Sequence, residues 1–453
     1  MGHSPVAVSA DAVPEHSTDQ PVQKPLSRLT RLYRSALFNV IIVGLISFTQ
    51  PGIWNALNNT GAGGQQKPYL VNGTNSLTFG IMFGCPLFSI LANRYGLRRV
   101  LILGTLGYAP YSASLYVNNR YGTERSVLFG GVTCGIAASA LWSSEGAIAL
   151  GYGAGIWLGL SELGQLIGSS IQLSLNVQDG ERGKVGYSTY LVLIALQCLG
   201  LPLAFLISHP SKEKAVLGEF HKLWVQVKKK HILLLIPILV GFNWNGTYQG
   251  IYLTNYFSVR ARTLGSLTSG IAATAANMFW GWVFDTKYFS RPTLARVTWL
   301  TFASVMVSLF GWQFANEKLY KDTQPTIDWA QPDFGRGFAV NVLFRLMNES
   351  HYMFVYWLLG VFNDDLETLT LTVGIARCFE SVGSCLSFGI GPAEVSPMVN
   401  LIVAFVIFVV CIPTTSWVVF MVPEHPQSVP KDDESSQGAE TYPGWLLPVQ
   451  LGN

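Results

Sequence analysis

Residues Leu141–Leu173, "LWSSEGAIALGYGAGIWLGLSELGQLIGSSIQL", decide the fold class because they are far more apolar than a segment of a soluble domain. No Lys or Arg occurs in residues 126–181, although residues 141–173 contain two carboxylates, Glu145 and Glu162. Each side of Gly151–Gly155 holds about 20 mostly apolar residues, the length of a membrane-spanning helix. The stretch therefore predicts two spans joined by a short turn of small residues.

The composition of the whole chain supports this interpretation. Of 453 residues, 49% are hydrophobic and 12% are charged, and the mean hydropathy is +0.34, whereas about a quarter of the residues of soluble domains are charged. The net charge of +3 gives no reason to expect nucleic acid as a partner. The six cysteines lie in apolar stretches without the paired spacing of a zinc site. No nucleotide-binding loop or nucleophile–base pair is evident, so we expect no enzyme, no metal and no cofactor.

Twelve stretches have the length and apolarity of a spanning helix. They are 36–57, 70–92, 100–117, 126–150, 155–177, 187–208, 232–255, 263–285, 296–315, 337–361, 368–390 and 398–421. With both termini in the cytoplasm, the inner connections carry more Lys and Arg than the outer ones, which is the expected bias. The longest basic segment, Ser208–His231, separates six spans from six.

The predicted fold is therefore an all-α membrane protein of about twelve transmembrane helices in two six-helix halves. The predicted organisation has a disordered cytoplasmic arm at 1–35, an N-terminal half at 36–208, a basic cytoplasmic linker at 209–231, a C-terminal half at 232–421 and a disordered cytoplasmic tail at 422–453. The lipid bilayer is the expected surrounding. A multi-pass protein of the plasma membrane and one of an internal membrane both fit this pattern.

The connection between the second and third spans, "GCPLFSILANRYGLRRV", resembles the signature inner loop of the major facilitator superfamily. A Gly marks the turn, and three Arg residues flank it where they can bond the last carbonyls of the preceding helix. The acid usual in the family is replaced by Asn. The residues of this loop are Asn93, Arg94, Gly96, Arg98 and Arg99.

A second resemblance is more specific. "FTQPGIWNALNNTGAGGQQKPYLVNGTNSLTFG", "LWSSEGAIALGY", "GIWLGLSELGQLIGSSIQLSLN" and "GFNWNGTYQGIY" resemble the uncoordinated-93-like branch of the same superfamily, particularly its fungal members. The residues of the first stretch that carry the resemblance are Pro51, Gly52, Trp54, Asn55, Ala56, Leu57, Gly61, Gly63, Gly64 and Gln65. The resemblance covers most of residues 36–421. It implies a transporter-like protein, and some animal members act as channel regulators or trafficking partners.

The chain departs from this branch at the connection between the fourth and fifth spans. Members usually carry an Arg-containing inner loop there, whereas this chain has only Gly151–Gly155. Five small residues can turn a helical hairpin, but they supply no inner positive charge. A true loss and an error in the gene model both explain the short connection.

Polar residues inside the spans are the candidates for function, because an intramembrane charge costs about 2.5–3.5 kcal/mol on insertion scales. The resemblance implies that the first, fourth, seventh and tenth spans line a central cavity. The candidates for a substrate or proton site on these spans are Gln50, Asn55, Glu145, Asn243, Asn245, Arg345 and Glu349. Glu145 has no basic residue on its own helix, which favours a cavity role, whereas Glu162 fits helix packing equally well.

Two intramembrane charge pairs have helical spacing. Arg345 and Glu349 are four residues apart, and Arg377 and Glu380 are three apart. Such spacing lets each pair neutralise itself within the bundle, so a structural role and a substrate or proton role both remain open.

Small residues and glycosylation signals complete the candidates. On the fifth span, Gly155, Gly159, Gly164 and Gly168 have the spacing that lets another helix approach closely, and we expect the eighth span as the neighbour. Asn58 and Asn72 are Asn-x-Ser/Thr signals placed in the first outer loop, where glycosylation would be expected.

Two function classes follow from the sequence. The leading hypothesis is a secondary transporter of a small solute or ion by alternating access, with a proton taken up by Glu145 or Glu349 and an anionic group held by Arg345. The alternative is a regulator or trafficking escort that kept the transporter fold and binds another membrane protein.

Overall fold

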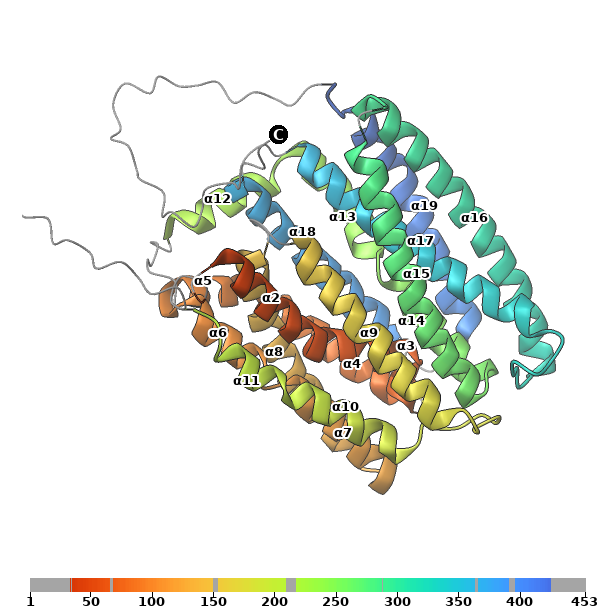
Figure 1. The fold of residues 1–453 in the computed structure, drawn as a ribbon. Helices are drawn as coiled ribbons and strands as arrows, with labels where there is room; N and C mark the ends of the chain where they lie inside the picture. Colours follow the sequence, from red (N-terminus) through yellow and green to blue (C-terminus); the bar gives the residue numbers. More distant parts are fainter. Residues whose placement is uncertain are drawn as a thin grey trace, which may run out of the picture.

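The computed structural model describes residues 33, 35–65, 68–149, 154–208, 217–286, 288–362, 366–390 and 396–424. Most of these residues are helical, with no strand among them and one isolated bridge between Phe257 and Ile327. Most of the predicted arm 1–35, most of the predicted tail 422–453 and residues 151–153 of the short connection lie outside the described part (Figure 1).

The first six predicted spans form helices, most of them in more than one piece. Their elements are α2 (Ala36–Ser47), the π-helix η1 (Phe48–Gly52), α3 (Ile53–Asn59), the short η2 (Ala62–Gly64), α4 (Pro68–Met82), α5 (Cys85–Tyr95), α6 (Leu97–Gly104), α7 (Tyr108–Tyr121), α8 (Glu124–Ala149), α9 (Ala154–Asn176), α10 (Tyr187–Cys198) and α11 (Gly200–Ala204). Pro51 lies inside η1, where the missing backbone donor interrupts the ladder of the first span.

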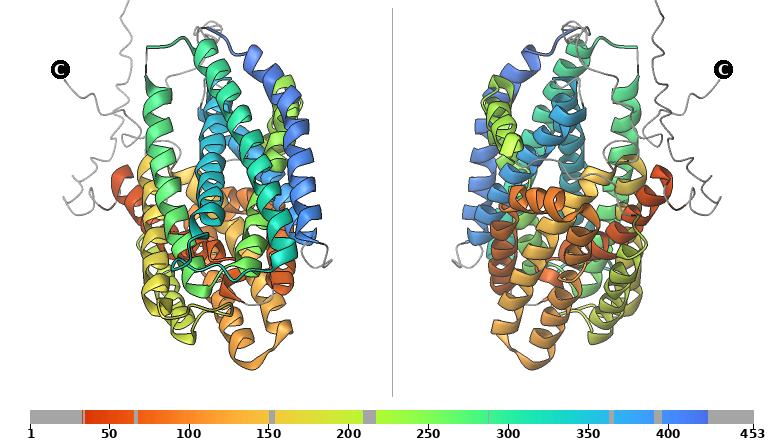
Figure 2. Two further views of the ribbon diagram at one scale, coloured as in Figure 1. Left: turned by 90° about the vertical axis from the view of Figure 1, so that its right-hand side faces the viewer. Right: turned by 90° about the vertical axis from the view of Figure 1, so that its left-hand side faces the viewer.

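The remaining elements include one helix that the sequence analysis did not expect, α12, inside the predicted basic linker. They are α12 (Leu217–Val227), α13 (Lys230–Gly241), α14 (Trp244–Tyr256), α15 (Val259–Asp285), α16 (Arg291–Thr323), α17 (Phe334–Val361), α18 (Leu366–Ile390) and α19 (Pro397–Phe420). Figure 2 shows the turn between α7 and α8 at one end of the bundle and the connection between α15 and α16 at the other, as the alternating direction of the predicted spans requires.

Seven described helices are long and apolar enough to cross a membrane, or eight if the bent pair α4–α5 forms one span. The predicted spans that fall short of this test include the fifth, seventh, eighth and tenth, which form α9, α13–α14, α15 and α17. These four spans contain segments that are rich in Gly and Ser or that carry charged residues. Helices that bury polar residues inside a bundle need less apolar surface than helices that face lipid.

The apolar side chains form two separate large cores. One core draws on residues between Ile42 and Ile207, together with Val259, and the other draws on residues between Ile232 and Val422. Between the two cores, α9 packs against α15 and α4 packs against α18. Ser169 and Ser266 share a hydrogen bond of 2.8 Å at the first of these contacts.

The small-residue motif of α9 packs against a different neighbour from the one predicted. A Cβ on Gly164 would lie 2.3 Å from the carbonyl oxygen of Phe48, and one on Gly168 would lie 2.8 Å from Cβ of Ala56. Both contacts are with the first span, not the eighth. Gly52 of the π-helix takes part in the same contact, since a Cβ built on it would lie 3.0 Å from Cα of Gly164.

A third glycine of the motif, Gly159, plays no part in this contact. A Cβ on Gly159 would meet nothing within 4 Å, and the surroundings of Gly155 lie outside the described side chains. Helix α9 does pack against α15, but through Ser169 and through Leu166, whose side chain lies 2.9 Å from a Cβ built on Gly270.

The first outer loop is shorter than predicted, which changes the position of both glycosylation signals. Asn58 lies in α3, and its Oδ1 accepts a hydrogen bond of 3.0 Å from Nδ2 of Asn75. Asn72 lies in α4 and is 5% exposed. An acceptor for a glycan must be accessible, so this placement does not favour glycosylation at either residue.

Candidate functional site

The helices around the two large cores form two bundles, the first running from α2 to α11 and the second from α13 to α19. A cluster of charged and aromatic side chains lies where the two bundles face each other, and we call it the interface cluster. It consists of Trp142 and Glu162 from the first bundle and Arg345, Glu349, Tyr352, Tyr356, Arg377 and Glu380 from the second. The two charge pairs that the sequence predicted are therefore present, and the structure adds the residues that surround them.

Arg377 on α18 is the cation of the cluster with the most contacts to aromatic rings. Its Nη1 lies 3.1 Å from Oε2 of Glu380, which confirms the predicted pair, and Oε1 of Glu380 accepts a hydrogen bond of 2.8 Å from Tyr356. The guanidinium also lies over the ring of Trp142 on α8, 4.5 Å from the centroid, and over Tyr352 at 5.1 Å. A cation–π contact thus joins the two bundles at this point.

Arg345 and Glu349 form the second predicted pair on α17, with Nη2 of Arg345 2.9 Å from Oε1 of Glu349. Their side chains are 24% and 14% exposed, so they border space that other groups can enter. Glu162 of α9 lies within electrostatic range of both, and its Oε2 is buried without a hydrogen-bond partner. Arg345 therefore interacts electrostatically with two carboxylates, one from each bundle.

Glu145, the leading candidate on the fourth span, is enclosed rather than open to a cavity. It is 0% exposed. Its Oε2 accepts a hydrogen bond of 3.2 Å from Nε1 of Trp157, which also donates to Oγ of Ser47 at 2.6 Å. The surroundings come from α2 and α9, so in this conformation Glu145 connects three helices of the first bundle.

Three further candidates are held within the protein. Gln50 is fully buried, and its Nε2 donates to the carbonyl of Gln197 at 2.6 Å, so it faces the sixth span instead of a central cavity. Asn243 lies at the break between α13 and α14, where its Nδ2 donates to Oγ of Ser384 at 2.8 Å. Asn55 is half-buried on α3.

Asn245 lines a small cavity inside the second bundle, together with Asn348, His351 and apolar side chains of α13, α16 and α19. Oδ1 of Asn245 and Nε2 of His351 are buried without a partner there. The residues that line this cavity all belong to the second bundle. Asn245 was predicted to line a central cavity between the bundles, and in this structure it does not.

The signature loop forms the expected turn. Gly96 adopts φ 92° and ends α5, with α6 beginning at the next residue. Arg98 donates from Nη2 to the carbonyl of Phe205 at 2.8 Å, whereas Arg94 and Arg99 are exposed. The side chain of Asn93 lies outside the described side chains.

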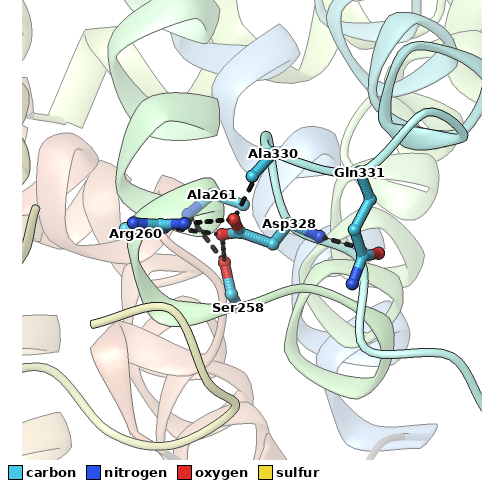
Figure 3. A network of polar contacts seen from close by, with 6 residues as sticks. All are labelled: Ser258, Arg260, Ala261, Asp328, Ala330 and Gln331. Atoms are coloured by element: carbon cyan, nitrogen blue, oxygen red, sulfur yellow. Dashed lines mark hydrogen bonds and ion pairs between the residues drawn. The ribbon is translucent and has the colours of Figure 1, made fainter. Parts of the chain in front are cut away.

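A polar network that was not predicted from the sequence lies at the end of the molecule opposite to the signature loop, and we call it the outer network. Figure 3 shows its first part, where Asp328 accepts hydrogen bonds from Nε of Arg260 at 2.7 Å and from Oγ of Ser258 at 2.6 Å. A second bond joins Arg260 Nη2 to the same carboxylate. Arg260 holds the pKa of the Asp328 carboxyl well below its usual range.

The outer network also contains Arg262, which is 0% exposed although it carries a charge. Its guanidinium donates to the backbone carbonyls of Thr60, Gly61 and Gln65 of the first bundle, and to that of Gly183. In the sequence, Arg262 was one of several basic residues of an outer connection. The spacing of residues along one helix does not indicate the role of Arg262, because its hydrogen-bond partners are 79 to 202 residues away in the sequence.

Glu317 was also missed, because the ninth span was predicted to end at residue 315, whereas α16 continues to Thr323. Glu317 is 1% exposed and accepts hydrogen bonds from the hydroxyls of Tyr248 at 2.6 Å and Tyr256 at 3.0 Å. It therefore joins α16 to α14.

The arrangement of helices defines the fold of the major facilitator superfamily. A D-xylose–proton symporter has a TM-score of 0.57 at 14% identity, with 86% of this chain and 98% of that chain covered. The nucleoside transporter NupG has a TM-score of 0.55 at 10% identity, with 85% and 98% covered. This similarity confirms the predicted fold, and the chain is a multi-pass integral membrane protein.

The sequence relatives confirm the resemblance to uncoordinated-93-like proteins. An UNC93-like protein of Schizosaccharomyces pombe is 27% identical over 389 residues, covering 79% of this chain and 76% of the relative. UNC93-like protein 1 of Arabidopsis thaliana is 25% identical, with 82% and 87% covered. Notoamide biosynthesis cluster protein O' of Aspergillus versicolor is 29% identical, with 86% and 90% covered. No family model matches the chain.

Proposed function

We propose that this protein is a secondary transporter that moves a small solute or ion by alternating access, with a proton as the coupling ion. The interface cluster is the observation that carries this proposal. It holds five charged side chains between the two bundles. In alternating access, such bundles move against each other during transport. Charges kept at such a place are costly, and a substrate path is a reason to keep them.

Within this proposal, Arg345 and the two carboxylates that face it form the site that changes charge. With Glu349 ionised, Arg345 is paired on its own helix. When Glu349 takes up a proton, Arg345 becomes available to Glu162 across the interface or to an anionic group of the solute. Binding of solute and proton would thereby become coupled through one guanidinium.

Glu145 has a different role in this proposal from the one predicted. Because it is enclosed by Ser47 and Trp157, we assign it to positioning of the first and fifth spans. Trp157 packs edge-on against Trp142 at 5.6 Å between centroids, and Trp142 contacts Arg377. Glu145 is therefore connected to the interface cluster through two indole rings.

The test is uptake into proteoliposomes that contain the purified full chain, with and without an inward proton gradient. The panel starts with D-xylose and nucleosides, the solutes named for the two structural neighbours. We expect Glu349→Gln and Glu162→Gln to reduce gradient-driven uptake at least about tenfold, whereas Asp322→Asn, an exposed acid outside the cluster, leaves it unchanged.

Equal uptake by the two variants and the parent would contradict the proton role. Absence of uptake for every solute, from protein that melts cooperatively, would favour the regulator or escort. In that case variants of the interface cluster would leave recovery of a membrane-protein partner unchanged.

A further inference from the structure

In the outer network, Arg262 joins the two bundles through its side chain. Arg182 of the first bundle does so as well, donating from Nη2 to the backbone carbonyls of Gln324 and Pro325. Arg262 extends from the first turn of α15 into a cage of carbonyl oxygens. Nε lies 2.9 Å from the oxygen of Thr60, Nη1 lies 2.9 Å from that of Gly183, and Nη2 lies 2.8 Å from that of Gly61 and 3.1 Å from that of Gln65. These four partners are all backbone carbonyls, so the guanidinium is held by dipoles and not by a carboxylate.

The glycines of the first outer loop explain why these carbonyls converge. Gly61, Gly63 and Gly64 have backbone φ angles of 83°, 56° and 76°, values that residues with a Cβ rarely adopt. The loop is fixed to its own bundle, since the carbonyl of Gly63 accepts from the Tyr190 hydroxyl at 2.9 Å. The cage is therefore a preformed part of the first bundle.

The loop also fits closely against the second bundle. A Cβ on Gly61 would lie 2.8 Å from the carbonyl of Gly250 and 2.8 Å from Oγ1 of Thr254, both on α14. Nothing larger than Gly fits there without movement. The contact between loop and α14 must therefore open whenever the two bundles separate at this end.

The turn that carries Arg262 is held in place on both sides. Ser258 caps α15, accepting from the backbone N of Ala261, and bonds Asp328 (Figure 3). The backbone N of Arg260 donates to the carbonyl of Asp179 at 3.0 Å, in the connection between α9 and α10. Arg262 is thus aimed at the cage by contacts with both bundles.

We propose that Arg262 is the positioning residue that holds the outer end closed, with its guanidinium as a removable occupant of the carbonyl cage. The inference rests on the proposed alternating access, because only a protein that opens at this end needs a releasable contact. Carbonyl dipoles can hold a cation without neutralising it, and water can replace them when the cation leaves. An ammonium has fewer donors in a different geometry, so Lys fills the same cage poorly.

The experiment measures access to the outer end, not transport. Thr254→Cys, placed beneath the loop on α14, is introduced in a background with the six native cysteines replaced. Labelling by a positively charged methanethiosulfonate is followed in the purified full chain. We expect slow labelling with Arg262 present. With Arg262→Ala it should be at least about tenfold faster, since loss of even one bond to a charged group corresponds to roughly that change in equilibrium.

Guanidinium ion provides the specific control. In Arg262→Ala it should re-enter the cage and slow labelling back toward the parent rate, whereas tetramethylammonium, an equal charge without N–H donors, should not. Arg120→Ala removes an exposed arginine that contacts only Tyr116 and Tyr121 among the described residues, and it should label at the parent rate.

Unchanged labelling in a cooperatively melting Arg262→Ala protein would overturn the proposal, as would equal slowing by guanidinium and tetramethylammonium. If that variant fails to fold, Arg262→Lys is measured in the same way, and a parent rate there overturns the proposal. Transport is not needed for any of these results. Fast labelling of Arg262→Ala in a protein without uptake would therefore refute the proposed function while leaving the outer contact established.

Discussion

The close contact between the first and fifth spans can be tested with two glycines of one helix. An added Cβ at Gly164 would lie 2.3 Å from the carbonyl oxygen and 2.8 Å from Cα of Phe48. Both atoms are backbone, so no side chain can rotate away, and α9 must move from the first span by about 1 Å to reach normal contact. Overpacking of this kind costs about 1–3 kcal/mol.

Gly159 is the matched control because a Cβ there would meet nothing within 4 Å. Alanine is a better helix former than glycine by about 0.5–1 kcal/mol. We therefore expect Gly159→Ala to be neutral or slightly stabilising and Gly164→Ala to be destabilising. Because the gain in helix propensity is the same in both variants, they should differ by the overpacking cost of about 1–3 kcal/mol, which corresponds to a few degrees in Tm.

The assay is thermal melting in one detergent, followed by tryptophan fluorescence at one scan rate, because melting of a protein this size is rarely reversible. Gly52→Ala tests the same contact from the first span, since its Cβ would lie 2.5 Å from the carbonyl oxygen of Ser161. Equal melting temperatures for Gly159→Ala and Gly164→Ala would refute the packing argument.

Three further outcomes are expected. Asp328→Asn should lower Tm at pH 7, because Arg260 keeps the pKa of this carboxyl below its usual range. A depressed pKa stabilises the folded protein at pH values above the unfolded pKa of about 3.9, so the difference in Tm between variant and parent should shrink as the pH falls below about 3.9. A difference in Tm that does not depend on pH would count against the ion pair. Glu317→Leu should destabilise by about 1–3 kcal/mol for each tyrosine O–H donor left without an acceptor, although the Tyr248 oxygen still accepts from Gln313. Glu317→Gln should be milder, and equal melting of the two variants would show that these bonds contribute little. Asn72→Gln should leave electrophoretic mobility unchanged after expression in a glycosylating host, and a faster band would show that the buried side chain is modified.

Several features could be predicted from the sequence because they depend on residues close together in the chain. Apolar length predicts a span, and the spacing of Arg345 from Glu349 and of Arg377 from Glu380 predicts an ion pair on one helix face, as both pairs show. Gly96 predicts a turn, as observed. The family resemblance was carried by contiguous motifs in the same way.

The direction in which a polar residue faces could not be predicted so well. Gln50 and Glu145 were placed on cavity helices by their span number, but Gln50 bonds the sixth span and Glu145 bonds Trp157 of the fifth. Span order does not fix the rotation of a helix about its own axis. That rotation is determined by packing against neighbours, and here the π-helix at Pro51 alters it within the first span.

By itself, then, the sequence determined the membrane class, the spans, the ion pairs within helices and the family resemblance, since each is a sum or a spacing along the chain. Only the tertiary structure decided that Glu162 comes within electrostatic range of Arg345, that Gly164 packs against the first span, and that Arg262 enters a cage of carbonyls. These contacts join residues that are far apart in the chain. Their partners include backbone carbonyls, which every residue carries, so residue type alone cannot identify them.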